Sequence, residues 1–353
     1  MKEDLSKIFQ IAFVFIGTIV GAGLASGQEI LNFFTSYGLS SFIGIIFCGF
    51  FYIVIAIIAS KISIKYNLNS YAELMSIVSP NILGKLTSVI TTLFMLSSAS
   101  IILAGSGALL NQFFGIPKLI GSLIMMTVAI FFLLRDTNGL IEVNSFIVPI
   151  LIFTITLITV LYFLFCKDIF SVDFINKFEP RKTGIVLSTL LYSAFNATSS
   201  CGVIVPLSNQ IKKPKNMIIG VTLGAIGLAV LSFIINLLLM VNQPYIYEYE
   251  IPLLLVAQRF GTIIQALLLT VILLEMFSTE ISDVYSISKT LNKVFKINFK
   301  QAIFLVILIA FPISTLGFSK LIKTLYPIFG ALCLIFISQT IIFYIKNRKT
   351  IND

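Results

Sequence analysis

Near its start the chain reads Val20-Gly21-Ala22-Gly23-Leu24-Ala25-Ser26-Gly27, in the middle of a run that is otherwise largely apolar. Glycine adopts backbone conformations that other residues avoid, so three glycines in so short a stretch favour a break in a helix. In a bilayer an exposed break is costly, because its N–H and C=O groups find no water there. The stretch therefore predicts a discontinuous membrane helix whose break faces a polar site inside the protein.

A second interruption lies about half the chain further on. It reads Asn196-Ala197-Thr198-Ser199-Ser200-Cys201-Gly202, between the largely apolar stretches 184–195 and 203–207. Broken helices at corresponding places in two halves of a chain are typical of secondary transporters, in which the substrate binds between two repeats. We therefore expect membrane helices one and six both to be discontinuous.

The composition excludes a soluble protein. Apolar residues make up 58% of the chain and charged residues 11%, which indicates an all-α polytopic membrane protein. The net charge of +9 does not indicate nucleic-acid binding, because the basic residues lie in short loops between apolar segments, where they act as topology signals. The chain has no histidine, and its four cysteines lack metal-site spacing, so we expect neither an enzyme nor a bound cofactor.

Ten apolar runs have membrane-spanning length. Lysine and arginine are about twice as frequent on one side of these runs, which places both termini in the cytoplasm. We expect a multi-pass protein of the bacterial inner (cytoplasmic) membrane, either a monomer or a loose homo-oligomer. The expected spans are 8–35, 41–64, 84–113, 118–135, 139–166, 184–208, 217–241, 261–290, 300–317 and 321–346.

Landmarks in the two halves recur at a nearly constant offset. Gly84 and Gly261 each open a span, and Pro149 and Pro327 each lie within one. Because five spans are an odd number, a second copy that starts outside must be inverted. The predicted architecture is a 5+5 inverted repeat, with residues 1–166 as the first copy, 167–183 as an external connection, and 184–353 as the second copy with a short cytoplasmic tail.

Two loops are expected to contain short helices. Ser70 and Glu73 have the spacing of a capping box, which predicts a short helix on the cytoplasmic side. Pro252 is a favourable first residue for a helix over 253–260 on the external side. This external helix would either act as a lid or rest on the surface.

The two breaks together predict a site for a zwitterion. In the first, the second half of the helix begins near Leu24 with free N–H groups that suit a carboxylate. In the second, the first half ends near Phe195 with free carbonyls that suit an ammonium group, and an amino acid is the simplest ligand with both. The alternatives are that the glycines only permit close helix packing and that the aromatic residues only pack. The candidate substrate-binding residues are Ala22, Gly23, Leu24, Ser26, Gly27, Tyr192, Phe195, Asn196, Thr198, Ser199 and Ser200.

Acidic residues within the spans are candidates for coupling or gating. Glu275 lies near the middle of span 261–290, where a charged carboxylate costs at least about 2.5 kcal/mol on insertion scales. It should bind an ion or a proton, or else be a protonated carboxyl bonded to a neighbouring helix. Glu280 lies further along that span, and Glu29 lies in the second half of the first span, either in the external vestibule or as a partner of the helix dipole.

The stretch Gly21–Glu29 resembles the amino acid–polyamine–organocation (APC) superfamily, and most of all the YkvI-type family of bacterial membrane proteins. The resemblance covers essentially all ten spans and implies a LeuT-type fold with a transporter-like role. It also implies that the backbone amides of Ala22 and Gly23 hold a substrate carboxylate. In the same way the resemblance implies a sodium site made of Gly17, Val20, Ser278 and Thr279. We add Glu275 to this candidate site, because its carboxylate lies nearby on the same span.

These observations predict a symporter that moves an amino acid or a related small zwitterion by alternating access, coupled to sodium or, as the second choice, to protons. Glu275 and Glu280 beside the hydroxyl pair depart from sodium-coupled relatives, which is why protons stay in consideration. The alternative function is a ligand receptor that does not transport, of the spore-germination receptor membrane-subunit type. Receptor and transporter would bind a ligand alike, so only uptake separates them.

Overall fold

A computed structural model describes residues 2–79, 82–134, 140–166 and 179–352. Within these residues the regular structure is helical throughout. Most of the expected external connection, residues 167–178, lies outside the described residues. The helices are α1 (Lys2–Ile19), α2 (Ala22–Ala25), α3 (Gln28–Phe33), η1 (Thr35–Tyr37), α4 (Ser40–Tyr66), α5 (Tyr71–Val78), α6 (Ile82–Phe114), α7 (Lys118–Leu134), α8 (Leu140–Phe165), α10 (Ile185–Ile211), α11 (Pro214–Val241), η3 (Tyr245–Glu248), α12 (Pro252–Gln258), α13 (Thr262–Phe295), α14 (Phe299–Ser314), α15 (Phe318–Lys346) and α16 (Arg348–Asn352).

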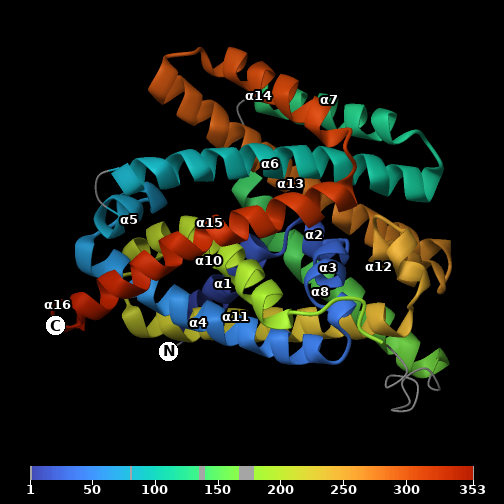
Figure 1. The fold of residues 1–353 in the computed structure, drawn as a ribbon, viewed down its shortest axis with the longest axis horizontal. Helices are drawn as coiled ribbons and strands as arrows, with labels where there is room; N and C mark the ends of the chain where they lie inside the picture. The colour runs from blue at the N-terminus through green and yellow to red at the C-terminus, as the bar shows by residue number, and fades with distance from the viewer. Residues whose placement is uncertain (1, 80–81, 135–139, 167–178, 353) are drawn as a thin grey trace.

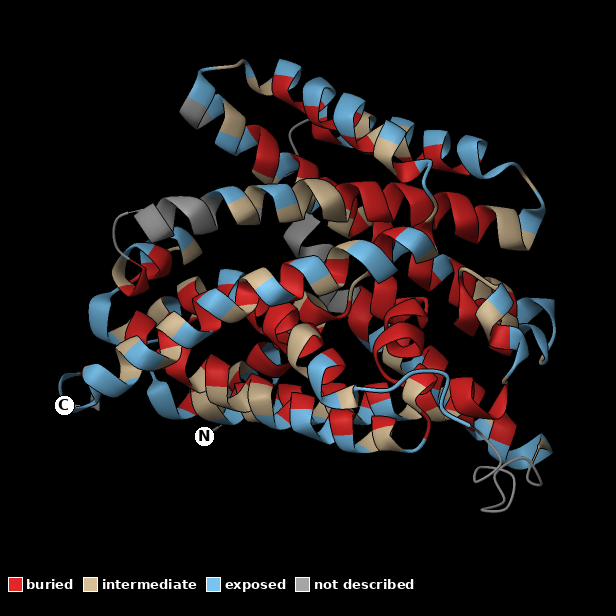
Figure 2. Cartoon of the chain, in the orientation of Figure 1, coloured by how far each residue is buried: buried red, intermediate tan, exposed pale blue. Residues whose placement is uncertain are grey.

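The outer surface suits a lipid environment. By length and composition, seven of the described helices can cross a membrane, namely α4, α6, α8, α10, α11, α13 and α15, and α7 and α14 are shorter apolar helices. Large apolar side chains stand on the outside, such as Ile263, which is 84% exposed, and Ile43, which is 73% exposed. Buried residues gather in the interior, where the helices face one another (Figure 2). The chain is a multi-pass membrane protein, and the count of ten crossings stays a prediction.

The long helices pack in two groups (Figure 1). The first group consists of α6, α7, α13 and α14, which contact one another, and the second consists of α1, α4, α10 and α11. Helix α15 contacts α6 in the first group and α10 and α4 in the second, and α8 contacts α13 and α1. The short helices α2 and α3 lie between the groups, because α2 contacts α13 while α3 contacts α10, α11 and α15.

The first membrane helix is discontinuous, as predicted. Helix α1 ends at Ile19, and Gly21 has an extended backbone (φ −106°, ψ −171°) before the single turn of α2. A second break follows at Gly27, whose φ of +83° is left-handed. A Cβ atom at Gly27 would also lie 2.8 Å from Leu253, so both conformation and space favour glycine there. The glycines therefore act at both ends of α2.

The predicted break in helix six is wrong. Helix α10 runs without interruption from Ile185 to Ile211, through the whole stretch 196–202. The reason is local, because the polar side chains bond back to carbonyls of their own helix. Thr198 Oγ1 donates to the carbonyl of Ala194 at 2.8 Å, and Ser200 Oγ donates to that of Ala197 at 2.8 Å. Serine and threonine are accommodated in helices in this way, and the stretch has one glycine where the first break has three.

Both predicted short helices are present. Ser70 Oγ accepts a hydrogen bond from the N–H of Glu73 at 3.3 Å, and Glu73 Oε2 accepts one from the N–H of Asn69 at 2.7 Å. This is the reciprocal pattern of a capping box at the start of α5. Helix α12 begins at Pro252, which needs no hydrogen-bond acceptor at a helix start.

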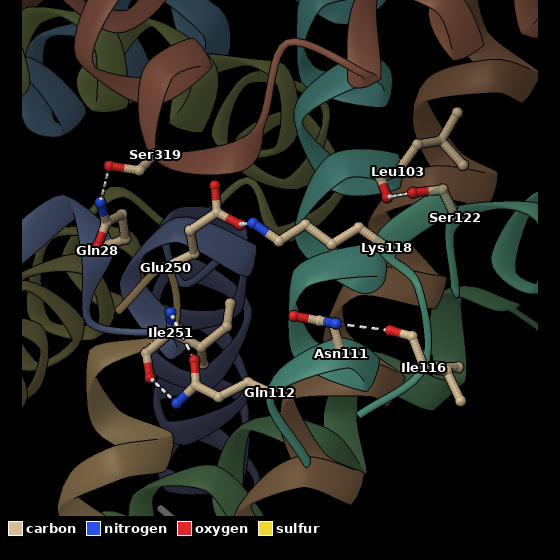
Figure 3. A network of polar contacts seen from close by, with 10 residues as sticks. All are labelled: Gln28, Leu103, Asn111, Gln112, Ile116, Lys118, Ser122, Glu250, Ile251 and Ser319. Carbon is tan, nitrogen blue, oxygen red and sulfur yellow. Dashed lines mark hydrogen bonds and ion pairs between the residues drawn. The ribbon is translucent and has the colours of Figure 1, made fainter. Parts of the chain in front are cut away.

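The segment with η3 and α12, residues 245–258, lies over the side of the break that is expected to be external, and we call it the outer cover. The N–H of Leu253 donates to the carbonyl of Ser26 at 3.0 Å, between α2 and α3. Gln112 on α6 makes two hydrogen bonds with the backbone of Ile251, at 3.0 and 3.2 Å (Figure 3). Lys118 Nζ lies 2.7 Å from a carboxyl oxygen of Glu250 in the same view. The outer cover therefore contacts the break directly, and it is also bonded to helices α6 and α7 of the first group.

Gln112→Leu should loosen the outer cover. The substitution removes both hydrogen bonds to Ile251, which is fully buried, so its backbone groups lose their partners. We expect the amide of Leu253 to exchange hydrogen about tenfold faster, or more, in hydrogen–deuterium exchange.

The matched control is Asn111→Ala, because Asn111 bonds to the carbonyl of Ile116 and not to the outer cover (Figure 3). Equal exchange of Leu253 in the two variants and in the wild type would contradict the role assigned to Gln112.

Candidate functional site

The break between α1 and α2 leaves backbone donors without helical partners. The first hydrogen bond of α2 runs from the N–H of Ala25 to the carbonyl of Gly21, at 2.9 Å. The N–H groups of Ala22, Gly23 and Leu24 come before it and lack intrahelical acceptors. These three residues are buried in the interior. They are the donors that the sequence assigns to a substrate carboxylate, an assignment that stays a prediction.

The carboxyl group of Glu29 lies against this turn. A Cβ atom on Gly23 would collide with Glu29 Oε1 and would lie 2.5 Å from its Cγ. Glu29 is 3% exposed and stands in the first turn of α3, so of its two expected positions the structure agrees with the partner of a helix dipole and not with the external vestibule. The physical reason is the turn at Gly27, after which Glu29 stands in the first turn of α3 and its side chain reaches back to α2.

Two tyrosine hydroxyls hold this carboxyl group. The hydroxyl of Tyr192 on α10 donates to Glu29 Oε2 at 2.9 Å. The hydroxyl of Tyr326 on α15 also hydrogen-bonds to the carboxyl of Glu29. Hydrogen bonds from such donors stabilise a carboxylate and fix its direction. Glu29 thus connects α3 with α10 and α15 at the level of the break.

Aromatic rings surround the two tyrosines. The ring centroid of Phe195 lies 4.6 Å from that of Tyr326, and that of Phe94 lies 5.2 Å from Phe195. Tyr192 packs edge-on against Phe34 with centroids 5.1 Å apart. The predicted pair Tyr192 and Phe195 is therefore brought to the break, whereas Tyr326 and Phe94 were not predicted. Tyr326 directly precedes Pro327, the proline landmark of the last span, which was the available signal in the sequence.

The polar stretch 196–200 of α10 faces the interior, but the helix does not end there. Asn196, Thr198 and Ser200 are buried, and Ser199 is partly buried. Asn196 Nδ2 donates to the carbonyl of Tyr192 at 3.2 Å. Because the helix continues, the free carbonyls expected near Phe195 do not form, and an ammonium group must find its partner elsewhere.

Helix α13 carries two buried carboxyl groups near α2. Glu275 is 1% exposed, and its Oε2 has no hydrogen-bond partner among the described residues. Glu280 is fully buried, and neither of its carboxyl oxygens has such a partner. Uncompensated carboxyl groups of this kind are expensive in a membrane and indicate a proton or ion site.

The candidate sodium ligands come from the end of α1 and from α13, on the two sides of α2 in the chain. Gly17 and Val20 stand at the end of α1, and Ser278 and Thr279 stand on α13, which packs against α2. Thr279 Oγ1 donates to the carbonyl of Glu275 at 2.9 Å, which leaves its oxygen free to accept. Among the described residues no three acidic or cysteine side chains converge as a metal site. That these residues bind sodium stays a prediction.

A hollow of about 230 Å³ opens at the outer ends of α3, α10 and α15. Lys182 and Lys323 both line it, and Lys182 Nζ donates to the carbonyl of Asn32 at 3.1 Å. Burial lowers the pKa of Lys182, and the positive charge of Lys323 lowers it further. The hollow gives the outer end of the broken helix a basic rim.

No family model matches the chain, but one curated relative matches it along its whole length. The chain is 28% identical over 351 residues to the membrane protein YkvI of Bacillus subtilis (strain 168), which covers 99% of this chain and 100% of that protein. The resemblance inferred from the stretch Gly21–Glu29 is thereby confirmed.

The fold is found in solved transporters. The inward-facing conformation of Mhp1 superposes with a TM-score of 0.74 at 13% identity, covering 97% of this chain and 77% of that one. MhsT in complex with L-phenylalanine superposes with a TM-score of 0.60 at 14% identity, covering 87% of this chain and 78% of that one. The chain is therefore similar to YkvI in sequence and has the LeuT-type fold of APC-type transporters.

Proposed function

We propose that this chain is an ion-coupled secondary active transporter, a symporter of an amino acid or a related small zwitterion. The observation that carries the proposal is the buried break in helix one, where free N–H groups meet a tyrosine-held carboxyl group between two packed groups of helices. A ligand bound there contacts both groups, so it can favour one arrangement of the groups over another.

The proposed architecture is ten membrane helices in two inverted copies, residues 1–166 and 184–353, within the bacterial inner membrane and with both termini in the cytoplasm. Mhp1, which shares the fold, is a nucleobase-cation-symport-1 family transporter, and MhsT was solved with L-phenylalanine. These neighbours support a small solute moved together with a cation.

Alternating access is supported by a difference between the two sides of the break. On the outer side the outer cover is fastened to the break and to α6. On the other side Gly202 and Val203, in the second half of α10, are exposed. The likeness to an inward-facing conformation of Mhp1 agrees with this asymmetry. Transport would then require the outer cover to detach while the cytoplasmic side closes.

The ion would bind between the end of α1 and α13. We assign Gly17, Val20, Ser278 and Thr279 to a sodium ion, with the carboxyl of Glu275 beside them. Protons are the second choice, because the carboxyl groups of Glu275 and Glu280 are buried. Among the described residues, Glu275 Oε2 and both carboxyl oxygens of Glu280 have no hydrogen-bond partner. Ion and substrate share the break, so each would raise the affinity for the other.

Proteoliposomes holding the protein should accumulate at least one amino acid from a radiolabelled mixture when a sodium gradient is imposed. Glu275→Gln should abolish the gradient-driven accumulation, because it removes the charge beside the ion, whereas Glu179→Gln, at an exposed position outside the helices, should not. Uptake driven by a proton gradient alone would assign protons as the coupling ion. Ligand binding without uptake under either gradient would support the receptor and contradict transport.

Gly23→Ala should weaken ligand binding by about tenfold or more, because the added methyl group displaces the carboxyl of Glu29 from its position on the turn. Gly21→Ala is the matched control, since nothing lies within 4 Å of a Cβ there and its φ of −106° suits alanine. The measurement is the shift in melting temperature of the purified protein across an amino acid titration. Equal affinities of the two variants would remove Gly23 from the site.

A further inference from the structure

Glu29 lacks the partner that a buried carboxylate needs. It is 3% exposed, and the ion pairs between described residues, Lys118–Glu250 and Lys213–Asp4, do not involve it. The hydroxyls of Tyr192 and Tyr326 donate to its carboxyl but carry no charge. A charge that is removed from water is costly unless an opposite charge compensates it. A carboxyl group in this position either takes up a proton or is paired with a cation that arrives from outside the chain.

The surroundings of Glu29 suit an organic ammonium group. The rings of Tyr192, Phe195 and Tyr326 follow one another beside the carboxyl, with centroids 6.5 Å and 4.6 Å apart. Ring faces attract ammonium groups, and most strongly where water is excluded. A bare metal ion would instead require a shell of oxygen ligands, which ring faces do not supply. Carboxylate and rings together thus favour a cation that is partly apolar.

The position of the carboxyl group adds a second constraint. Its Oε1 lies against Gly23 in the turn where the free N–H groups of α2 begin. A ligand with only a carboxylate would meet a like charge there, whereas a ligand with an ammonium group would neutralise it. Helix α10 continues through Phe195, so the free carbonyls expected there are not another partner for the ammonium group.

We propose that Glu29 binds the positively charged amino group of the substrate, so that the transported class is primary amines, including amino acids, and not simple carboxylates. This inference rests on the proposed function, because it assigns one end of the proposed substrate. Tyr192 and Tyr326 are positioning residues that orient the carboxylate of Glu29. The amino group is then the required feature of the ligand, and the carboxylate is optional.

The test uses purified full-length protein and nine probes: L-alanine, L-leucine and L-phenylalanine, each with its decarboxylated amine and its deaminated acid. Affinities come from thermal-shift titrations. The wild type should bind at least one amino acid, should bind the matching amine within about tenfold of it, and should not bind the matching acid. Glu29→Gln should weaken the binding of both amine-bearing probes by roughly tenfold to a hundredfold. Glu179→Gln is the matched control at an exposed carboxyl.

The outcomes separate this inference from the proposed function. Wild-type binding of the deaminated acid as tightly as the amino acid would overturn the role of Glu29 and leave the transporter proposal standing, and this comparison needs no variant. Unchanged amine affinity in a folded Glu29→Gln would do the same. If the wild type binds none of the nine probes, both the amine assignment and the amino acid substrate are overturned.

Discussion

The structure depends on the satisfaction of backbone hydrogen bonds where no water is available. A helix can be broken inside a bilayer only where protein surrounds the break, since lipid offers neither donors nor acceptors. Here the breaks on either side of α2 are enclosed by α10, α11, α13 and α15, and the outer cover supplies the N–H of Leu253 to the carbonyl of Ser26. The packing of the long helices around α2 and α3 follows from this requirement.

The same requirement makes the break a meeting point for the two groups of helices. Helix α2 contacts α13 in the first group, and α3 contacts α10 and α11 in the second. The carboxyl of Glu29 ties α3 to α10 and α15 through hydroxyl groups. Since packed groups of helices change position as units, a ligand at their common contact has leverage on both. A site of this kind serves alternating access better than a site within one group would.

Much of the fold could be predicted from the sequence, because glycine at Gly21 and Gly27 acts locally and apolar length marks a membrane helix. The break expected at 196–202 was wrong, because composition does not show whether polar side chains line a break or bond back to carbonyls of their own helix. The position of Glu29 was missed for a different reason. The chain turns at Gly27, so the side chain of Glu29 points back toward α2. Its partners Tyr192 and Tyr326 lie about 160 and 300 residues away in sequence, so only the tertiary structure brings them together.

The central claim is that the turn at Ala22–Leu24 carries free backbone donors that a ligand uses. The most direct measurement is hydrogen–deuterium exchange of these amides in lipid nanodiscs, compared with the amides of α4. Fast exchange in the unliganded protein, followed by protection when a bound amino acid is added, is the predicted result. Exchange at 22–24 as slow as in α4, and unchanged by any ligand that stabilises the protein, would contradict the account.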